Sequence, residues 1–447
     1  MSRIALIGEN SSVYVSLLID IWNNHDCAVL LDWRIPYAAL IDLMTEAKVE
    51  KCYIDEKIYN KFALSLDCNI EFITYDNHVT TEYIPSEICD KYMDNYSEDE
   101  AIIIYSSGTT GRSKGIILSH RAIQLNADAI IDYMQPNTSD VIYIVKTISH
   151  SSTITGELLV GLKSKMQIVI APVIVPPRII LRNIIQYQVT IVCINPTLAA
   201  LMCDEVERQE YHISSLRKIY VSGSILYDHV YDRLHKLFDA IEIYNVYGLS
   251  EAGPRVSAQT ASTAKINSVG KPICGVKIAI IDDDGNVLHN GEKGIIYVRS
   301  NSLFSGYVWG NNITSILIDS WLNTGDIGYI DDINELHIVG RKDEMIVIDS
   351  HKIYPEEIEE RICKYYGIRE CVVVKVPTID EYILGCVYVG NDIIIDDLIK
   401  YLKQYLMPYE IPKKYVKYDR IPKNKNGKID RNSITATTVK GKANTCT

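Results

Sequence analysis

A loop rich in hydroxyl groups and glycine is the segment of this chain whose residue types best suit chemistry. It follows the apolar run 101–105 and consists of Ser106, Ser107, Gly108, Thr109, Thr110, Gly111, Arg112, Ser113, Lys114 and Gly115. Glycines permit tight turns, so backbone N–H groups and side-chain hydroxyls can point into one concavity, to which a lysine adds positive charge. The segment therefore indicates a phosphate-binding loop. The alternative is a flexible Ser/Gly surface loop, which is seldom placed between two apolar runs.

The spacing of the loop differs from that of a Walker A motif. That motif requires G-x-x-x-x-G-K-[ST], whereas here the order is G-x-x-G-x-x-K-G. Gly115 follows Lys114 at the position where a magnesium-binding hydroxyl would stand. A P-loop kinase or GTPase is therefore disfavoured.

The loop resembles the signature of the adenylate-forming superfamily, which includes acyl-CoA synthetases, peptide-synthetase adenylation domains and firefly luciferase. Later segments are similar to further motifs of this family, in the family's order. They are 245–251 (N-V-Y-G-L-S-E), 324–326 (T-G-D), 340–343 (G-R-K-D) and 422–431 (P-K-N-K-N-G-K-I-D-R). Alone, each is compatible with an ordinary turn or, for the last, a solvated basic face. The combination is specific because the motifs occur together and in order.

The resemblance implies a site for ATP or AMP built from several of these segments. Asn245 would hydrogen-bond the adenine edge and Tyr247 would stack on its face, while Asp326 and Arg341 would bind the ribose. Ser250 stands where the family usually has threonine and keeps the hydroxyl. The expected nucleotide-binding residues are Ser106, Ser107, Gly108, Thr109, Thr110, Gly111, Lys114, Ser222, Gly223, Ser224, Asn245, Val246, Tyr247, Gly248, Ser250, Asp326 and Arg341.

The resemblance also implies magnesium, held by oxygens of Glu251 and Thr109, and a catalytic lysine, Lys428. A substrate carboxylate and the α-phosphate of ATP are both negative, so cations must offset the charge that builds up at phosphorus. The expected catalytic residues are Lys428, Glu251, Thr109 and His150. Asp343 matches the hinge about which the family's small C-terminal domain turns, with a turn or helix-capping role as the alternative.

The acid would bind in a pocket formed by segments 147–156, 195–198 and 222–224. The residues expected to line it are His150, Ser152, Gly156, Ser222 and Gly223. A lone histidine is often structural, but His150 falls where many acyl- and aryl-CoA synthetases place one. Ser152 stands where amino-acid-activating relatives carry an aspartate, which disfavours an α-amino acid as substrate.

The acceptor of the acyl group is expected to be CoA or the phosphopantetheine of an acyl or peptidyl carrier protein. The loop after the hinge weakens this expectation. Val347 stands where a lysine often does, and Asp349-Ser350 replaces a small, often glycine-containing turn. The rival interpretations are a peptide-synthetase-type amino-acid adenylation enzyme and a non-catalytic nucleotide-binding scaffold of the same fold.

The elements that must position these residues are typical of an α/β fold. Helix-length segments separate short apolar runs at residues 4–7, 28–31, 52–54 and 70–73, as in βαβ units with a buried parallel sheet. From about residue 270, strands separated by turns indicate a β-rich subdomain. A strand at 371–376 and a helix at 396–406 follow.

Two helix starts can be predicted from capping residues. Ser119 is expected to cap a helix that runs from His120 to about residue 133. Pro355 is expected to begin another, whose first turn carries Glu356 and Glu357 at its positive end.

The length of 447 residues favours two or three domains. We expect an adenylation core at 1–342 with a shortened N-terminus, a mobile α+β domain at 343–435 that carries Lys428, and a flexible tail at 436–447.

The amino-acid composition of the chain restricts the kinds of partner that it can bind. The chain is 47% hydrophobic and 23% charged, as in soluble globular proteins, and its net charge of −12 gives no drive toward nucleic acid or an anionic membrane. The longest apolar run, 168–175, falls short of the roughly 20 residues of a membrane-spanning helix. We expect no secretory signal, because the first residues lack a basic region and a long apolar run, and the 11 cysteines include no C-x-x-C pair. A cytoplasmic monomer or homodimer with reduced cysteines is expected.

Overall fold

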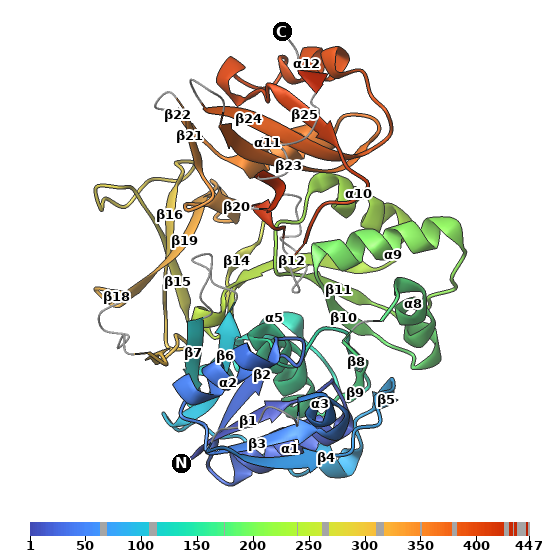
Figure 1. Cartoon of the computed structure of the whole chain (residues 1–447), viewed down its shortest axis with the longest axis vertical. Coiled ribbons are helices and arrows are strands. Elements are labelled where there is room, and N and C mark those ends of the chain that lie inside the picture. Colours follow the sequence, from blue (N-terminus) through green and yellow to red (C-terminus); the bar gives the residue numbers. More distant parts are fainter. Residues whose placement is uncertain are drawn as a thin grey trace. The chain divides into compact units, whose positions relative to one another are not determined.

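The computed structural model describes residues 1–62, 69–106, 114–173, 175–238, 240–261, 268–309, 317–348, 351–377, 382–423, 429–431, 433–435 and 444–445. The chain forms two compact units, whose helices and strands are labelled in Figure 1. The first comprises Met1–Leu226, Arg233–Ala279 and Tyr297–Thr324, and the second comprises Tyr227–Asp232, Ile280–Ile296 and Gly325–Thr447. Since the chain passes between the units several times, the boundary at 342/343 stays a prediction.

The first unit contains a seven-stranded sheet in the order β17-β7-β6-β2-β1-β3-β4. Its strands are β1 (Arg3–Ile7), β2 (Cys27–Leu31), β3 (Lys51–Asp55), β4 (Glu71–Tyr75), β6 (Glu100–Ser106), β7 (Lys114–Ser119) and β17 (Gly306–Tyr307). Strand β2 is buried at every position and pairs in parallel with β1 and β6, as expected for a strand covered on both faces.

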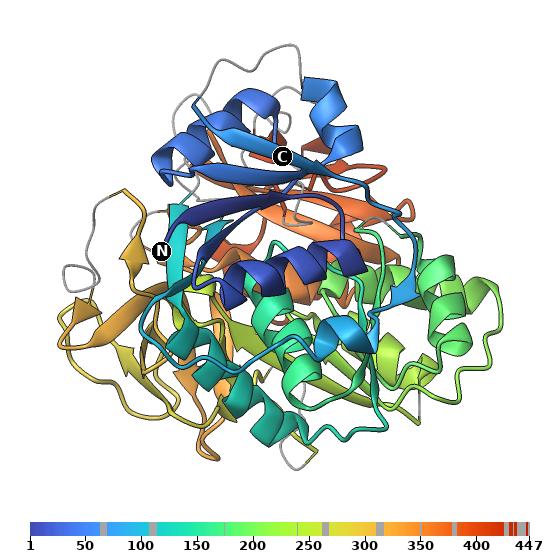
Figure 2. The same cartoon turned by 90° about the horizontal axis from the view of Figure 1, so that it is seen from below.

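Helices cover both faces of this sheet. Helices α2 (Tyr37–Glu46) and α3 (Glu56–Phe62) contribute Leu40, Met44 and Ile58 to one core cluster, which also contains Ala5 and Val29 from the sheet. Helix α1 (Ser12–Asn23) lies on the opposite face, as Figure 2 shows. The short helix α4 (Ser86–Cys89) contacts α1.

The second sheet of this unit has eight strands in the order β14-β13-β12-β11-β10-β8-β9-β5. Strands β9, β8, β10, β11 and β12 run parallel to one another, while β5 and β13 pair antiparallel with the two ends of this group. The strands are β5 (Glu82–Tyr83), β8 (Val141–Ile144), β9 (Gln167–Ile170), β10 (Ile191–Ile194), β11 (Lys218–Val221), β12 (Glu242–Gly248), β13 (Arg255–Ala258) and β14 (Lys271–Pro272).

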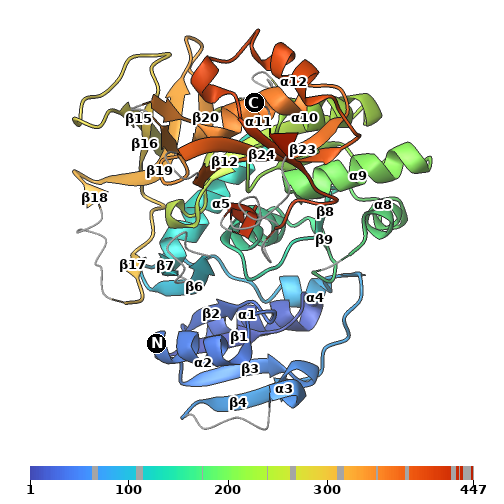
Figure 3. The ribbon, with the colours of Figure 1, turned by 45° about the horizontal axis from the view of Figure 1, so that its top comes forward.

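Helical segments connect these strands. They are α5 (His120–Met134), α6 (Ser151–Thr153), the π-helix η2 (Ile154–Leu159), α7 (Val160–Lys163), α8 (Pro177–Gln186), α9 (Pro196–Arg208), α10 (Asp228–Leu237) and the 3₁₀-helix η3 (Ser250–Ala252). Helices α8 and α9 lie side by side (Figure 3). Parallel strands joined by helices confirm the predicted α/β class.

A β-rich region follows, as predicted. Its sheet has the order β15-β16-β19-β18, with β20 also paired to β19. The strands are β15 (Val276–Ile281), β16 (Gly294–Ser300), β18 (Leu317–Ile318), β19 (Trp321–Ile330) and β20 (Leu336–Arg341).

The C-terminal part of the second unit is a small α+β structure. Strands β21 (Ile346–Ile348) and β22 (His351–Ile353) pair with each other, and β23 (Ile368–Pro377), β24 (Tyr382–Gly390), β25 (Lys414–Lys417) and β26 (Asn444–Thr445) form a further sheet. Helices α11 (Pro355–Cys363) and α12 (Ile395–Leu402) and the 3₁₀-helix η5 (Pro408–Glu410) complete it. Of the predicted tail, the structure describes only Asn444–Thr445, which pairs with β25.

Both predicted helix starts are confirmed. The Ser119 side chain accepts a hydrogen bond from the Ala122 backbone N–H at 3.1 Å, and Pro355 is the first residue of α11. The predicted helix at 396–406 is shorter than expected, because the N–H of Tyr405 bonds the carbonyl three residues back, at Leu402. A tighter turn therefore replaces its last turn.

Candidate nucleotide and acid site

Four parallel strands bring most of the predicted core residues to one edge of the eight-stranded sheet. Ile194 of β10 lies opposite Val221 of β11, which lies opposite Asn245 of β12. The segments predicted to form the acid pocket, 147–156, 195–198 and 222–224, follow the ends of β8, β10 and β11. Ligands of open α/β sheets bind at the carboxyl ends of parallel strands. The fold therefore gathers these segments where a ligand would bind.

Tyr307, which the sequence analysis missed, links two predicted site residues. The antiparallel pairing of β17 with β7 places Tyr307 opposite Ile116, beside the exit of the hydroxyl-rich loop. The Tyr307 hydroxyl donates a hydrogen bond of 3.1 Å to Glu251 Oε1, and Lys114 Nζ lies 5.6 Å from the centre of the Tyr307 ring. Burial and the Glu251 carboxylate raise the pKa of Tyr307, so its hydroxyl stays a donor at neutral pH. The loop lysine and the predicted magnesium ligand are thus held around one aromatic ring.

The Asn245–Glu251 element runs from β12 into η3. Asn245 and Val246 are both buried. The side-chain amide nitrogen of Asn245 donates a hydrogen bond to the Ser268 carbonyl at 3.2 Å. Tyr247 is half-buried and Gly248 is exposed. A methyl group at Gly248 would lie 2.2 Å from the Pro254 carbonyl oxygen, so the chain needs glycine there.

The predicted acid-pocket segment contacts this element directly. Ser151 Oγ lies 2.9 Å from Ser250 Oγ. His150 is exposed and caps α6, and its Nδ1 accepts from the Ser152 backbone N–H at 3.3 Å and lies 2.9 Å from Ser152 Oγ. Because Nδ1 is the acceptor, the neutral imidazole carries its proton on Nε2. His150 therefore caps α6 from an exposed position.

Ser222, Gly223 and Ser224 follow β11 at the same sheet edge. Gly223 has φ of +102°, a conformation that glycine adopts without strain. Asn195, at the end of β10, caps α9 by accepting from the Leu198 N–H at 2.8 Å. A turn and a helix start therefore border the predicted pocket.

The predicted ribose residues lie in the second unit, where they form an ion triad with the predicted hinge residue. Asp326 and Arg341 are paired in register on β19 and β20, and Arg341 Nη1 donates to Asp326 Oδ1 at 2.9 Å. Arg341 Nε donates to Asp343 Oδ1 at 3.1 Å. Burial lowers the pKa of Arg341, but the Asp326 and Asp343 carboxylates outweigh it and raise the value overall. One guanidinium thus orients both carboxylates.

Several predicted residues lie outside the described residues, so the structure does not test their roles. These are Ser107, Gly108, Thr109, Thr110, Gly111 and Lys428, together with the side chain of Ser106 and the Asp349-Ser350 turn.

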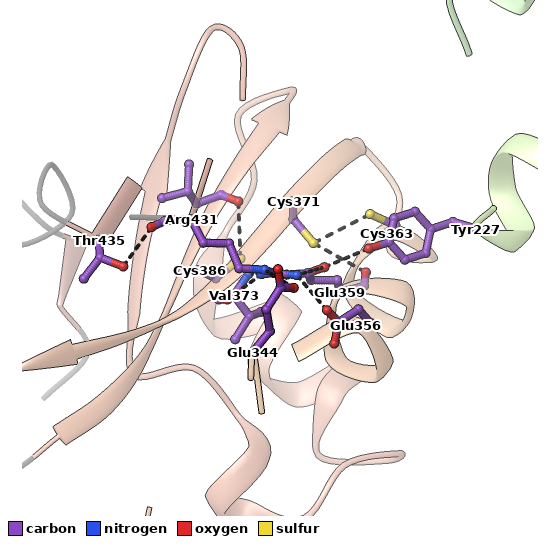
Figure 4. Close-up of polar contacts among 11 residues, drawn as sticks. Tyr227, Glu344, Glu356, Glu359, Cys363, Cys371, Val373, Cys386, Arg431 and Thr435 are labelled. Atoms are coloured by element: carbon purple, nitrogen blue, oxygen red, sulfur yellow. Dashed lines mark hydrogen bonds and ion pairs between the residues drawn. The ribbon is translucent and has the colours of Figure 1, made fainter. Parts of the chain in front are cut away.

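The segment that follows Lys428 is anchored by a half-buried arginine, Arg431, shown in Figure 4. Arg431 donates to Glu359 Oε1 at 2.5 Å, to Glu356 Oε1 at 3.1 Å and to Glu344 Oε2 at 3.1 Å. It also donates to the Val373 carbonyl at 2.9 Å. Lys423 and Ile429, the described residues on either side of 424–428, form an antiparallel β-bridge. Both flanks of Lys428 are therefore fixed to the small domain.

Glu359 is the best-satisfied carboxylate of this cluster. Besides Arg431, it accepts from the Val373 N–H and from the Tyr227 hydroxyl, both at 2.7 Å. Glu356 Oε2, in contrast, is buried without a hydrogen-bond partner in the described part of the chain. A methyl group at Gly340 would lie 2.4 Å from this oxygen, so Gly340 leaves room for Glu356.

Glu356 should make stability depend on pH. Burial, together with Glu359 and Glu344, raises its pKa to about 8, although Arg431 acts in the opposite direction. The folded state therefore keeps a proton that the unfolded state releases near its ordinary pKa, so wild-type stability should fall as pH rises from about 4.5 to about 8. Glu356→Gln removes this loss, and we expect its melting temperature to exceed that of the wild type by a margin that grows over this interval. A margin independent of pH would contradict the assignment.

Comparison with known proteins defines the class. The family model for AMP-binding enzymes matches residues 1–308, and the model for the AMP-binding enzyme C-terminal domain matches residues 357–428. The chain therefore belongs to the AMP-binding enzyme family, within the adenylate-forming superfamily, which confirms the resemblance seen in its motifs. The predicted architecture of a large N-terminal and a small C-terminal domain is confirmed as well.

The sequence identity to individual relatives is low. The chain is 27% identical to 4-coumarate-CoA ligase 1 of Narcissus pseudonarcissus over 77% of its own length and 66% of the relative. It is 28% identical to a long-chain-fatty-acid–CoA ligase of Yersinia pestis over 78% of its length and 63% of the relative. The chain thus spans slightly less than two thirds of these relatives. The ATP-bound crystal structure of MatB from Rhodopseudomonas palustris superposes with a TM-score of 0.85 at 22% identity, over 98% of this chain and 89% of MatB.

Among the described residues, Glu251 is suited to bind magnesium. Mg²⁺ usually keeps several waters and binds one or two carboxylates together with substrate phosphates. Glu251, half-buried and oriented by Tyr307, is a suitable carboxylate. Among the described residues, no helix is long and apolar enough to cross a membrane.

Proposed function

We propose that this protein is an AMP-forming acid–thiol ligase. It joins a small carboxylic acid to ATP as an acyl-adenylate with release of pyrophosphate, then passes the acyl group to CoA or to a carrier-protein phosphopantetheine. The observation that carries the proposal is the Lys114–Tyr307–Glu251 arrangement, which holds a cation and a carboxylate around one ring at the end of the predicted phosphate-binding loop. Relatives named as ligases of 4-coumarate and of long-chain fatty acids support the acid–CoA chemistry.

In the first step, a carboxylate oxygen attacks the α-phosphorus of ATP, and the bond to the bridging oxygen breaks as pyrophosphate leaves with the electron pair. Lys114 and Lys428 would supply positive charge near the phosphates and the attacking carboxylate. Magnesium, when bound to Glu251 and Thr109, would offset further phosphate charge. Asn245, Tyr247, Asp326 and Arg341 would hold the nucleoside, so that binding energy orients the α-phosphate.

In the second step, the acceptor sulfur attacks the acyl carbonyl carbon, and AMP leaves as the carbon–oxygen bond to phosphate breaks. His150, which is exposed and caps α6, would orient the acyl group. Asp343 would act as the hinge of the small domain, for which we propose residues 343–435.

Thioester formation tests the acceptor. The protein is incubated with ATP, magnesium, a panel of acids and either CoA or a holo carrier protein, and the products are identified by mass spectrometry. We expect AMP and an acyl thioester, formed faster than the adenylate hydrolyses in water. Equal rates of adenylate loss with and without thiol would remove the second step.

A further inference from the structure

Three charged side chains lie near one another in the interior of the first unit. Lys146 follows β8, and its Nζ lies 2.9 Å from Oε1 of Glu157, which is on the π-helix η2. Arg255 is the first residue of β13 and is only 4% exposed. The side chain of Glu157 is fully buried and that of Lys146 is 16% exposed. This interior region therefore contains two basic groups and one acidic group.

The single carboxylate cannot balance both basic groups. Glu157 lies 2.9 Å from Lys146, and neither of its oxygens has a hydrogen bond of good geometry to a described residue. Burial raises the pKa of Glu157, while Lys146 and Arg255 both act to lower it. Arg255 Nη1 is buried and has no hydrogen-bond partner among the residues that the structure describes. A buried guanidinium that lacks a complete set of partners is costly, and an anion at this position would satisfy it.

The backbone of Arg255 is held firmly while part of its guanidinium is left unsatisfied. Its N–H donates to Asn126 Oδ1 at 2.9 Å, and its carbonyl accepts from Asn126 Nδ2 at 2.9 Å. A rigid backbone fixes where the guanidinium can reach. That is the arrangement needed for a charged group that recognises a ligand.

The guanidinium lies against the predicted acid pocket. A methyl group placed on Gly156 would be 3.2 Å from Arg255 Nη2, a tight contact, so glycine leaves room for this approach. Gly156 lies on a π-helix, a geometry often found at functional sites. Arg255 is also paired in register with Gly248 on the neighbouring strand β12, within the Asn245–Glu251 element. Arg255 therefore lies between the residues proposed to bind the acid and those proposed to bind ATP.

We propose that Arg255 binds a second negative group on the substrate, which makes the substrate class dicarboxylic acids. One carboxylate is activated at the α-phosphate, and the other pairs with the guanidinium through charge-assisted hydrogen bonds. Lys146 and Arg255 together carry one positive charge more than Glu157 can balance, and the second carboxylate of the substrate would supply the missing negative charge. This inference rests on the proposed ligase function.

Matched acids test the inference on the wild-type protein. Pyrophosphate release is measured for dicarboxylic acids over a range of chain lengths and for the mono-methyl ester of each, which keeps the reacting carboxylate and removes the second charge. At the preferred length we expect kcat/KM for the dicarboxylic acid to exceed that of its half-ester about 100-fold. Half-esters that react as fast as their parent acids at every length would overturn the inference alone. No pyrophosphate release with any acid would overturn the proposed function as well.

A variant pair separates recognition from structure. Arg255→Leu should lower kcat/KM for the dicarboxylic acid about 100-fold and leave that for the half-ester unchanged or higher, which inverts the preference. Arg178→Leu, an exposed arginine of α8, serves as the control and should change neither value. Equal losses for both acids in an Arg255→Leu protein that keeps its near-UV circular dichroism would show a structural role and overturn the proposal.

Discussion

Lys428→Ala is expected to lower acid-dependent exchange of pyrophosphate into ATP by about 1000-fold, at the upper end of what removal of one charge-stabilising group costs. The reacting carboxylate and the α-phosphate are both anions, so the lysine would act where negative charge accumulates in the transition state. Nucleotide binding should change far less, because the other proposed ATP contacts remain. The loss should therefore appear in kcat rather than in KM for ATP.

Lys425→Ala is the matched control for this variant. Lys425 belongs to the same basic segment, residues 412–431, which holds eight basic and two acidic side chains. If this segment is only a solvated basic face, the two substitutions should have similar, small effects. A residual exchange rate in Lys428→Ala within a few-fold of that in Lys425→Ala would contradict the catalytic assignment.

Arg431→Ala is expected to destabilise the second unit by about 3–5 kcal/mol, because it leaves a buried carboxylate cluster without its cation. The guanidinium of Arg431 donates hydrogen bonds to Glu344, Glu356 and Glu359 at 2.5–3.1 Å. Hydrogen exchange is the suitable measurement, since it reports each part of the chain separately. Protection of the amides of α11 and β23, including Val373, should fall by about 100-fold or more.

Two controls accompany this experiment. Amides of β1 and β2, in the first unit, should keep their wild-type protection. Arg420→Ala removes an exposed arginine from the same C-terminal segment and should change stability by no more than about 0.5 kcal/mol. Wild-type protection of β23 in Arg431→Ala would show that the cluster does not stabilise this unit.

Local signals in the sequence were sufficient to predict many elements of the fold. The apolar runs at 4–7 and 28–31 became β1 and β2, and Ser119 and Pro355 mark helix starts because capping and the fixed φ of proline act within one turn. The ends of β10 and β11 carry the predicted pocket segments, since parallel strands present their carboxyl ends at one edge.

Long-range contacts were not predictable in this way. Tyr307 reaches Lys114 through a two-residue strand that pairs across almost two hundred positions of sequence, and no local pattern marks it. Glu356 was predicted from its favourable place at a helix start, but its burial against Arg431 depends on how α11 packs. The burial of Arg255 and Glu157 could not be predicted from local sequence either, because it depends on how β13 and η2 pack in the folded chain.

The central claim is that this chain activates a carboxylic acid as its adenylate. Its most direct test is exchange of radiolabelled pyrophosphate into ATP by the wild-type protein, with and without a panel of carboxylic acids that includes dicarboxylic acids. We predict label in ATP only when a suitable acid is present. Tight binding of ATP with no exchange for any acid in the panel would contradict the claim and favour a nucleotide-binding scaffold.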